Sequence, residues 1–299
     1  MDNLNKINHF VVLMLENRSF DNVLGFLYDQ RNAEPFKSPP RGQSLESLGN
    51  QSTLEGCRDH HGDLFTPGYG STYCDPYPDP GEEFFHVNMQ LYGSINPRAN
   101  SAYPFNYPPY NLPLNVNTPN MQGFVLDFMS NYRASCFDMK AHDVLDGSPL
   151  PMWLKKIIAR FVLKTIPKPK PEQYRIIMNC FTPQQLPIIS TLAVNYAVCD
   201  HWFASVPTQT QPNRSFVHAA TSHGYVINGV KFLLADSLTI FDRFHQAGVN
   251  WHVYYDKESI LSLTGLLHSR IYRNFPEHFL FMEEFYNHAA AGTLPAYSL

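Results

Sequence analysis

The chain of 299 residues lacks several features that would assign it to a class at once. It has no apolar run of about 18 residues, so we expect no membrane-spanning helix. Its first residues contain no basic stretch followed by an apolar one, so we expect no cleavable signal. This leaves open a cytoplasmic protein and one exported by a signal-independent route. The net charge of -4 argues against a nucleic-acid partner bound through a broad basic surface.

Cysteine is scarce, and its positions form no metal-binding pattern. The five cysteines include no Cys-x-x-Cys pair, so neither a zinc knuckle nor a thioredoxin-like motif is supported. Cys57 and Cys74 lie in polar, loop-like sequence and could form a disulfide in an oxidising compartment. Cys199 ends an apolar run, which predicts a buried thiol.

The composition that is present indicates a globular α/β protein. Apolar residues make up 44% of the chain and charged residues only 16%, enough apolar sequence for a real core. Strand-like and helix-like segments alternate, which predicts a mainly parallel sheet flanked by helices. The expected strands are residues 7–15, fully buried, 197–200, 249–256 and the start of one at 294–299. The expected helices are residues 19–28, 121–132, 183–195 and 275–292, the last ended by Gly292.

Two further segments are distinctive. Residues 29–120 are rich in Pro, Gly, Asn and Tyr, and we expect a long loop-rich insertion that covers a site, because structureless loops of this length are uncommon. Residues 152–173 are basic and amphipathic, with Lys155, Lys156 and Arg160 opposite an apolar side. This pattern is typical of a surface helix packed on a core, and also of a helix that lies on a membrane surface.

The apolar run at residues 7–15 stops abruptly at Glu16 and Asn17. In parallel sheets, ligands bind at the carboxyl ends of the strands, and Asp200 is expected at another such end. A carboxylate and an amide oxygen together suit a divalent cation. The alternative is a helix cap in which Glu16 pairs with Arg18. If Glu16 and Asn17 form a metal site, we expect Arg18 to neutralise nearby charge.

A second constellation is "VPTQTQPNRSF" at residues 206–216. Pro212 suits the first turn of a helix, which would place the Thr210 hydroxyl beside a helix N-terminus that favours an anion. Arg214, one turn later, could clamp phosphate oxygens. A hydroxyl, an anion site and a metal together predict phosphoryl transfer. The alternative is an ordinary threonine N-cap.

Here the sequence resembles a known family. The segments "HFVVLMLENRSFDNVLGFL" and "CDHWFASVPTQTQPNRSFVHAATSHG" resemble the bacterial and plant non-specific phospholipase C family, whose relatives include bacterial acid phosphatases. "DPGEEFFHVNMQLYG", "PNMQGFV" and "WHVYYDKESILSLTGLLH" are similar to it as well. The resemblance runs from about residue 9 to residue 299. It implies an alkaline-phosphatase-like α/β fold, with residues 1–299 forming the N-terminal part of one phosphoesterase domain.

The resemblance also implies a set of site residues. Glu16 and Asn17 fall on the family's metal-binding pair, and Thr210 falls on its hydroxyl nucleophile, which also approaches the metal. The implied cofactor is one divalent ion, with Ca²⁺, Mg²⁺, Mn²⁺ and Zn²⁺ all open. Arg214 and Asn213 would hold the phosphate or the loop itself. Candidates for the acid that protonates the leaving alcohol are His218, His268, His86 and His201. Among them, His218 is assigned to catalysis, and His268 and His86 to substrate binding with Asn213.

This chain departs from the family in one respect. Family members continue beyond the point where it ends, into an Asp-rich "DEHGG"-type segment that supplies the remaining metal carboxylates, and no such segment occurs here. The metal would then bind weakly and the sheet would lack strands. The chain is therefore expected to be an N-terminal fragment. Alternatively, it is complete, and either a partner supplies the rest or it is a non-catalytic lipid-phosphate binder.

The leading functional expectation is hydrolysis of glycerophospholipids, such as phosphatidylcholine, in the manner of a phospholipase C. Aromatic-rich loops and the basic segment at 152–173 favour a lipid substrate and peripheral membrane contact. A phosphomonoesterase on the same scaffold is the alternative enzyme, and an inactive fragment is the alternative outside catalysis.

Overall fold

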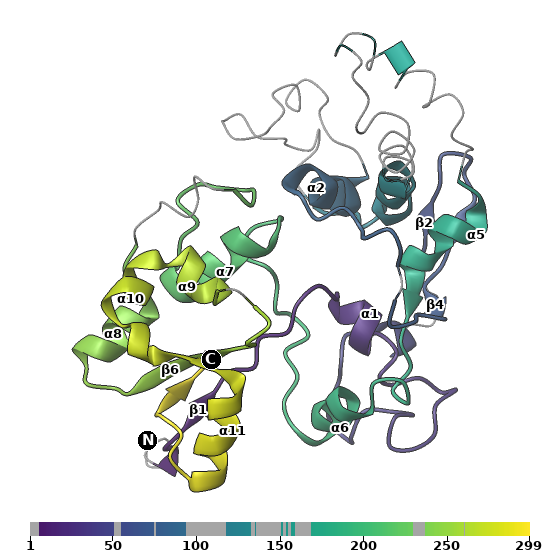
Figure 1. The fold of residues 1–299 in the computed structure, drawn as a ribbon. Coiled ribbons are helices and arrows are strands. Elements are labelled where there is room, and N and C mark those ends of the chain that lie inside the picture. The colour runs from purple at the N-terminus through teal and green to yellow at the C-terminus, as the bar shows by residue number, and fades with distance from the viewer. Residues whose placement is uncertain are drawn as a thin grey trace. The chain divides into compact units, whose positions relative to one another are not determined.

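The computed structural model describes most of the chain, in two compact units. The described residues are 6–50, 55–74, 76–93, 118–132, 169–229, 237–259 and 261–299, with 135, 151, 154, 157 and 158. The first unit contains the described residues up to Asn17 and Ala204–Leu299; the second contains those from Arg18 to Phe203. Each unit is considered by itself (Figure 1). Within the described residues, no helix has the length and apolar character needed to cross a membrane.

The first unit is built on a parallel sheet flanked by helices. Its four strands follow the order β1-β8-β6-β7 and pair in parallel, with Phe10 of β1 opposite Tyr297 of β8. The strands are β1 (Phe10–Val11), β6 (Trp251–Tyr255), β7 (Phe279–Phe281) and β8 (Tyr297–Ser298). The helices are α7 (Thr210–Ala219), α8 (Ile240–Gln246), α9 (Leu263–Leu267), α10 (Ser269–Asn274), η5 (Pro276–His278) and α11 (Met282–Ala291). The predicted mixed α/β architecture with a mainly parallel sheet is therefore confirmed.

The two faces of β6 explain why this strand is the centre of the unit. Because side chains alternate along a strand, Trp251 and Val253 lie on one face, in a core with Phe241 of α8. Tyr254 lies on the opposite face against α11, where its hydroxyl is 2.8 Å from Nδ1 of His288. Both faces of the sheet are therefore covered at β6, and Figure 1 shows α8 and α11 on either side of it.

Some predicted elements are correct. The strand at 249–256 is confirmed as β6, the segment at 294–299 forms β8, and Gly292 ends α11 with φ 69°. The helix after Asn17 is confirmed but shorter, as α1 (Phe20–Leu24), with Ser19 as its N-cap. Residues 124–132 are helical, and the helix predicted at 183–195 is α6 (Pro187–Asn195).

Three predicted elements are wrong. Residues 7–15 form only the two-residue β1, at one edge of the described sheet, and Leu13 and Leu15, which follow β1, are 73% and 72% exposed. Residues 197–200 form no strand, so Asp200 does not end one. Residues 275–292 are not one helix, since the segment from Pro276 forms η5 and β7 before α11 begins. The basic stretch at 152–173 lies largely outside the described residues, and its interpretation stays a prediction.

The second unit has its own small cores. Val125 and Phe128 pack with Tyr174 in one cluster, and Leu24 packs with Leu27 in another. Its elements besides α1 and α6 are η2 (Leu48–Asn50), β2 (Cys57–Arg58), β3 (Leu64–Phe65), β4 (Gly68–Tyr69), α2 (Phe84–Tyr92), α5 (Pro171–Tyr174), η3 (Arg175–Met178) and β5 (Asn179–Cys180). The described part of the predicted 29–120 insertion therefore contributes strands and a helix to a packed unit.

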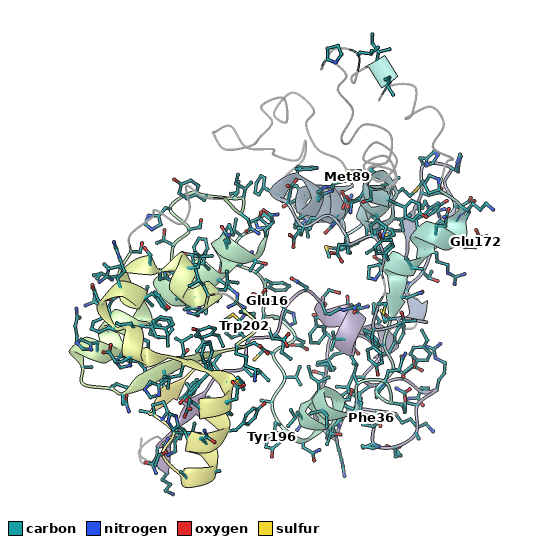
Figure 2. The ribbon with its side chains drawn as sticks, viewed as in Figure 1. Glu16, Phe36, Met89, Glu172, Tyr196 and Trp202 are labelled. Carbon is teal, nitrogen blue, oxygen red and sulfur yellow. The ribbon has the colours of Figure 1, made fainter. Side chains whose placement is uncertain are left out.

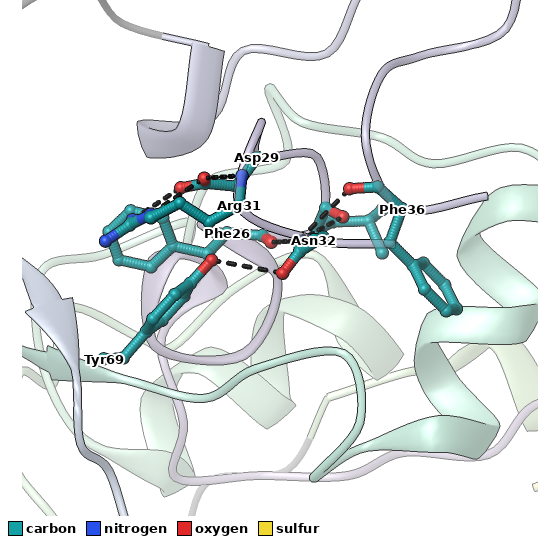
Figure 3. A network of polar contacts seen from close by, with 7 residues as sticks. Phe26, Asp29, Arg31, Asn32, Phe36 and Tyr69 are labelled. Carbon is teal, nitrogen blue, oxygen red and sulfur yellow. Dashed lines mark hydrogen bonds and ion pairs between the residues drawn. The ribbon is translucent and has the colours of Figure 1, made fainter. Parts of the chain in front are cut away.

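A polar network fixes the turn that follows α1 (Figure 3). The Asn32 side-chain amide donates to the Phe36 carbonyl at 3.1 Å, and its oxygen accepts from the Tyr69 hydroxyl at 3.2 Å. Arg31 forms an ion pair with Asp29 and lies 4.2 Å above the Tyr69 ring. The hydrogen bond from Arg31 holds the pKa of Asp29 below its ordinary value. This network ties the turn to β4 through Tyr69.

The cysteine predictions are also corrected. Cys57 and Cys74 are both free, so they form no disulfide; Cys57 is buried and its thiol donates to the Met121 carbonyl at 3.3 Å. Cys199 is exposed and not buried, because the strand that was expected to carry it inwards is not formed.

Two histidines of the first unit, His218 and His268, are buried. Three of their four ring nitrogens have no hydrogen-bond partner among the described residues. His218 of α7 is 2% exposed, and neither of its ring nitrogens has a hydrogen-bond partner in the described part of the chain; His268 lacks one there at Nε2. Their rings meet edge to face with centroids 5.6 Å apart. Burial is the main cause that lowers the pKa of His218 to about 3 and that of His268 to about 4. Both imidazoles are therefore neutral at pH 7.

We expect this pair to make the protein sensitive to acid. At pH values below the ordinary histidine pKa of 6.5, the two histidines bind protons in the unfolded chain but stay neutral in the folded chain. This difference lasts until the pH reaches their pKa values in the folded chain, about 4 for His268 and about 3 for His218. The free energy of unfolding should therefore fall as the pH decreases from about 6.5 to about 4, by up to ~1.4 kcal/mol per pH unit per histidine. Urea denaturation at several pH values measures this slope.

The matched variants isolate the contribution of the pair from that of other groups. His218→Phe and His268→Phe together remove both titrating rings and keep an aromatic side chain at each position. We expect the double variant to show a shallower slope between pH 4 and 6.5. The exposed His60→Gln serves as the control and should leave the slope unchanged. An unchanged slope in the double variant would contradict this account.

Candidate functional site

The candidate site is built around the start of α7, where Thr210 is the first helical residue and Gln209 is the N-cap. The interpretation of Thr210 as the N-cap is therefore wrong. The preceding loop is held by Asn213, whose side-chain amide donates to the carbonyls of Val206, Thr208 and Gln209 at 3.0, 2.9 and 3.1 Å. Its side-chain oxygen accepts from the Val206 amide at 3.1 Å. Asn213 thus holds the loop, one of the two roles expected for it.

A second asparagine, Asn228, forms hydrogen bonds with residues at the start of α7. The Gln211 amide donates to Oδ1 of Asn228 at 2.9 Å, and the Asn228 amide donates to Oε1 of Gln209 at 2.8 Å. One bond joins the helix backbone to the Asn228 side chain and the other joins a helix side chain to the Asn228 backbone, so Asn228 is tied to the start of α7. Among the described residues, the half-buried Thr210 hydroxyl has no hydrogen-bond partner. It is thus placed at a rigid helix start with its oxygen uncommitted.

Arg214 connects this helix to Glu16. Arg214 Nε donates to Oε1 of Glu16 in an ion pair, with side chains 16% and 29% exposed. Because residues four apart lie on the same helix face, Arg214 and Thr210 share one face of α7. The ion pair therefore brings the carboxylate from the N-terminal segment to the helix that carries the candidate nucleophile. Glu16 is labelled in Figure 2.

The chain turns sharply directly after Glu16. Asn17 has a positive φ of 69°, a left-handed conformation that asparagine tolerates better than most residues. Arg18 was expected to neutralise the charge of the acid or to pair with it. Instead, Arg18 donates to the Tyr73 carbonyl at 3.0 Å, and Arg214 is the ion-pair partner of Glu16.

Glu16 and Asn17 carry oxygen atoms of the kind that a divalent ion prefers. Glu16 keeps a second carboxylate oxygen beside the one that accepts from Arg214, and Asn17 adds an amide oxygen, so both have suitable hard donors. However, the described residues contain no group of three or more His, Cys, Asp or Glu side chains that could hold a metal ion. They therefore supply part of a ligand set and do not form a complete site.

The four candidate histidines fall into different settings. His218 lies two turns along α7 from Thr210, about 12 Å of helical rise, and is buried and neutral with His268. His201, in the second unit, is exposed between Asp200 and Glu46, and its hydrogen bond to Asp200 raises its pKa. His86, also in the second unit, has Nδ1 2.6 Å from Oδ1 of Asp127, and its side chain is 16% exposed.

Sequence reasoning missed three residues that order the candidate groups. Asn228 lies far along the chain from the helix start it fixes, and only the structure reveals the contact. Asp127 and Gln90 contact each other, and Asp127 contacts His86. Asp127 does carry a sequence signal, since it is a lone acid in the otherwise apolar helical run "FVLDFM".

Comparison with known proteins shows the family of the chain. The Phosphoesterase family model matches residues 7–299. Non-specific phospholipase C4 of Arabidopsis thaliana is 31% identical over 83% of this chain and 36% of its own length. Non-specific phospholipases C3 and C1 of the same plant are 28% and 27% identical over 97% and 98% of this chain, and over 44% and 42% of their own lengths. The chain thus spans about two fifths of the length of these relatives. It belongs to the phosphoesterase family.

Proposed function

We propose that this chain carries the nucleophile of a phosphoric ester hydrolase of the phospholipase C type, on an alkaline-phosphatase-like sheet. The observation that supports it most is the arrangement on α7. An uncommitted Thr210 hydroxyl stands at the helix start, and Arg214 lies one turn away on the same face, paired with Glu16. The family match supports phosphoester chemistry, and the relatives named phospholipase C support a glycerophospholipid such as phosphatidylcholine.

The proposed reaction has two steps. Thr210 Oγ1 attacks phosphorus, the bond from phosphorus to the alcohol oxygen breaks, and diacylglycerol leaves with a proton. Water then attacks the phosphothreonine, returns the threonine hydroxyl and releases the phosphorylated head group. The N-terminal end of α7 and the cationic Arg214 favour the anionic phosphate in both steps. Asn213 keeps the loop before Thr210 in place, and His218, His268 and His86 remain candidates for proton transfer and binding.

We expect Thr210→Ala to abolish hydrolysis of p-nitrophenyl phosphocholine, a chromogenic phosphodiester, because no hydroxyl remains to form the covalent intermediate. The loss in kcat should be on the order of 10³-fold or more. Thr210→Ser is the matched control, since it keeps a hydroxyl at the same position and should retain measurable turnover. Release of p-nitrophenol is followed by absorbance, and circular dichroism checks that each variant is folded.

The outcomes separate the alternatives. Turnover of the diester, lost in Thr210→Ala, supports the phospholipase C proposal. Faster turnover of p-nitrophenyl phosphate, a monoester, would instead support a phosphomonoesterase. Equal activity in wild type and Thr210→Ala would refute Thr210 as the nucleophile, and no activity in folded wild type would refute catalysis by this chain alone.

We further propose that Glu16, Asn17 and Thr210 bind one divalent ion together with ligands from outside the described residues. When bound, the ion would supply Lewis-acid chemistry at the phosphate. Hard oxygen donors from a carboxylate, an amide and a hydroxyl suit such an ion, and the incomplete donor set predicts weak binding. The proposal does not choose among Ca²⁺, Mg²⁺, Mn²⁺ and Zn²⁺. Peripheral contact with a membrane stays a prediction.

We expect added divalent metal to raise the melting temperature of the wild type and to do so less in Glu16→Gln, because a ligand stabilises the state that binds it. Thermal unfolding with Mg²⁺, Ca²⁺, Mn²⁺ or Zn²⁺, or with EDTA, measures the shift. Glu46→Gln is the control, since Glu46 is an exposed acid of the second unit that pairs with His201. An equal metal-induced shift in wild type and Glu16→Gln would place the ion elsewhere.

A further inference from the structure

The chain that leaves α7 returns to the start of the same helix. After the helix it turns, and the Tyr225 amide donates to the Ser222 carbonyl at 3.0 Å. Beyond this turn, the Val226 carbonyl accepts from Oγ1 of Thr208, which precedes α7, at 2.5 Å. Residues 226–229 therefore lie beside the residues that lead into the helix.

Asn228, in this returning segment, supplies a cap to α7 from outside the helix. The first N–H groups of a helix have no partner within it, and the side chain of the N-cap residue usually accepts one of them. Here the N-cap residue, Gln209, makes no such bond. Instead, the Gln211 amide donates to Oδ1 of Asn228, 17 positions along the chain, at 2.9 Å. Pro212, the next residue of the helix, has no N–H that needs a partner.

Two more hydrogen bonds tie the same segment to the residues on either side of Thr210. Gln209 Oε1 accepts from the Asn228 amide at 2.8 Å, and Gln211 Oε1 accepts from the Gly229 amide at 3.0 Å. Thr210 itself takes part in none of the three bonds. Both neighbours of the candidate nucleophile are therefore held by residues 228 and 229.

The cap that Asn228 provides is uncharged. The N-terminus of a helix carries a partial positive charge that attracts anions. An aspartate would accept the hydrogen bond from Gln211 equally well, because asparagine and aspartate are similarly good caps. Its carboxylate, however, would place a negative charge where the proposed reaction binds an anionic phosphate. An asparagine fixes the helix start without cancelling its positive charge.

We propose that Asn228 is a positioning residue, which holds the turn at Thr210 through a neutral cap and so leaves the positive end of α7 to the phosphate. The inference rests on the proposed function, because the phosphate site at α7 belongs to that proposal. It goes beyond a structural role, because it requires that the cap be uncharged. A substitution that keeps the cap and adds a charge separates these two roles.

Asn228→Ala tests the cap itself. Hydrogen exchange, measured by mass spectrometry on the full chain, should become faster at the Gln211 amide, because this amide loses its partner. The loss of a cap should also lower the melting temperature by about 2–4 °C. In an active chain, kcat for p-nitrophenyl phosphocholine should fall on the order of tenfold, because Thr210 is no longer held in place.

Asn228→Asp tests whether the cap must be neutral. This variant should keep the slow exchange at Gln211 and the melting temperature of the wild type. Its affinity for inorganic phosphate, measured by isothermal titration calorimetry, should fall roughly three- to tenfold at low salt, because the new carboxylate repels the anion. The loss should be smaller in about 0.5 M NaCl, because salt screens the repulsion.

Asn250→Asp is the matched control. It makes the same substitution in the first unit, at an exposed residue directly before β6. Because the sheet is parallel, Asn250 lies at the amino ends of its strands, whereas Glu16 follows β1 at the carboxyl ends. Asn250→Asp should therefore change neither the phosphate affinity nor the exchange at Gln211.

The outcomes separate this inference from the proposed function. Unchanged exchange at Gln211 in Asn228→Ala overturns the inference, and so does a phosphate affinity in Asn228→Asp equal to that of the wild type. A wild type that binds no phosphate overturns it as well. If Asn228→Asp weakens phosphate binding as expected but the chain does not hydrolyse the diester, the catalytic proposal falls and the role of Asn228 stands. If Thr210→Ala abolishes turnover while both Asn228 variants behave like the wild type, the proposed function stands and this inference falls.

Discussion

The ion pair between Glu16 and Arg214 is the interaction on which the candidate site depends. It joins residues 198 positions apart in the sequence and links the segment after β1 to helix α7. The Arg214 and Glu16 side chains are 16% and 29% exposed, so the pair is partly shielded from water, and losing it should cost more than losing a fully exposed pair. Without this contact, nothing else among the described hydrogen bonds and ion pairs connects the acid to the helix of Thr210.

The sheet supports this contact through its chain order. β1 lies at one edge and pairs only with β8, which is close to the other end of the chain, so the path from β1 towards Glu16 begins at a fixed place in the first unit. Asn17 then turns the chain through a left-handed conformation. At the helix, Asn213 and Asn228 fix the loop and the first turn through their amides. The amide side chains of Asn213 and Asn228 thus hold the loop and the helix start in place, and the ion pair between Glu16 and Arg214 connects the segment after β1 to α7.

Local sequence predicted those features that local physics controls. The alternating β-branched and aromatic residues of β6 and the glycine that ends α11 are examples, as is the helix that begins at Thr210. It failed where the outcome depends on distant partners. An apolar run such as residues 7–15 does not reveal whether one or both edges of its strand are paired. In the same way, no local signal shows that Phe279–Phe281 pairs with β6 as strand β7. The partner of Glu16 and the carboxylate behind His86 are likewise long-range contacts that no spacing rule encodes.

The electrostatics of α7 explain why its positive charge resides on Arg214 and not on the histidine that follows it. Burial and the nearby positive groups, Arg214 among them, lower the pKa of His218 to about 3, so its ring remains neutral. Arg214 stays charged, and its Nε–H donates to Glu16, which leaves the terminal amino groups outside that bond. A guanidinium held at Nε by a carboxylate is oriented and still has donors for an anion. The same carboxylate retains a second oxygen, which is the one that we propose for the divalent ion.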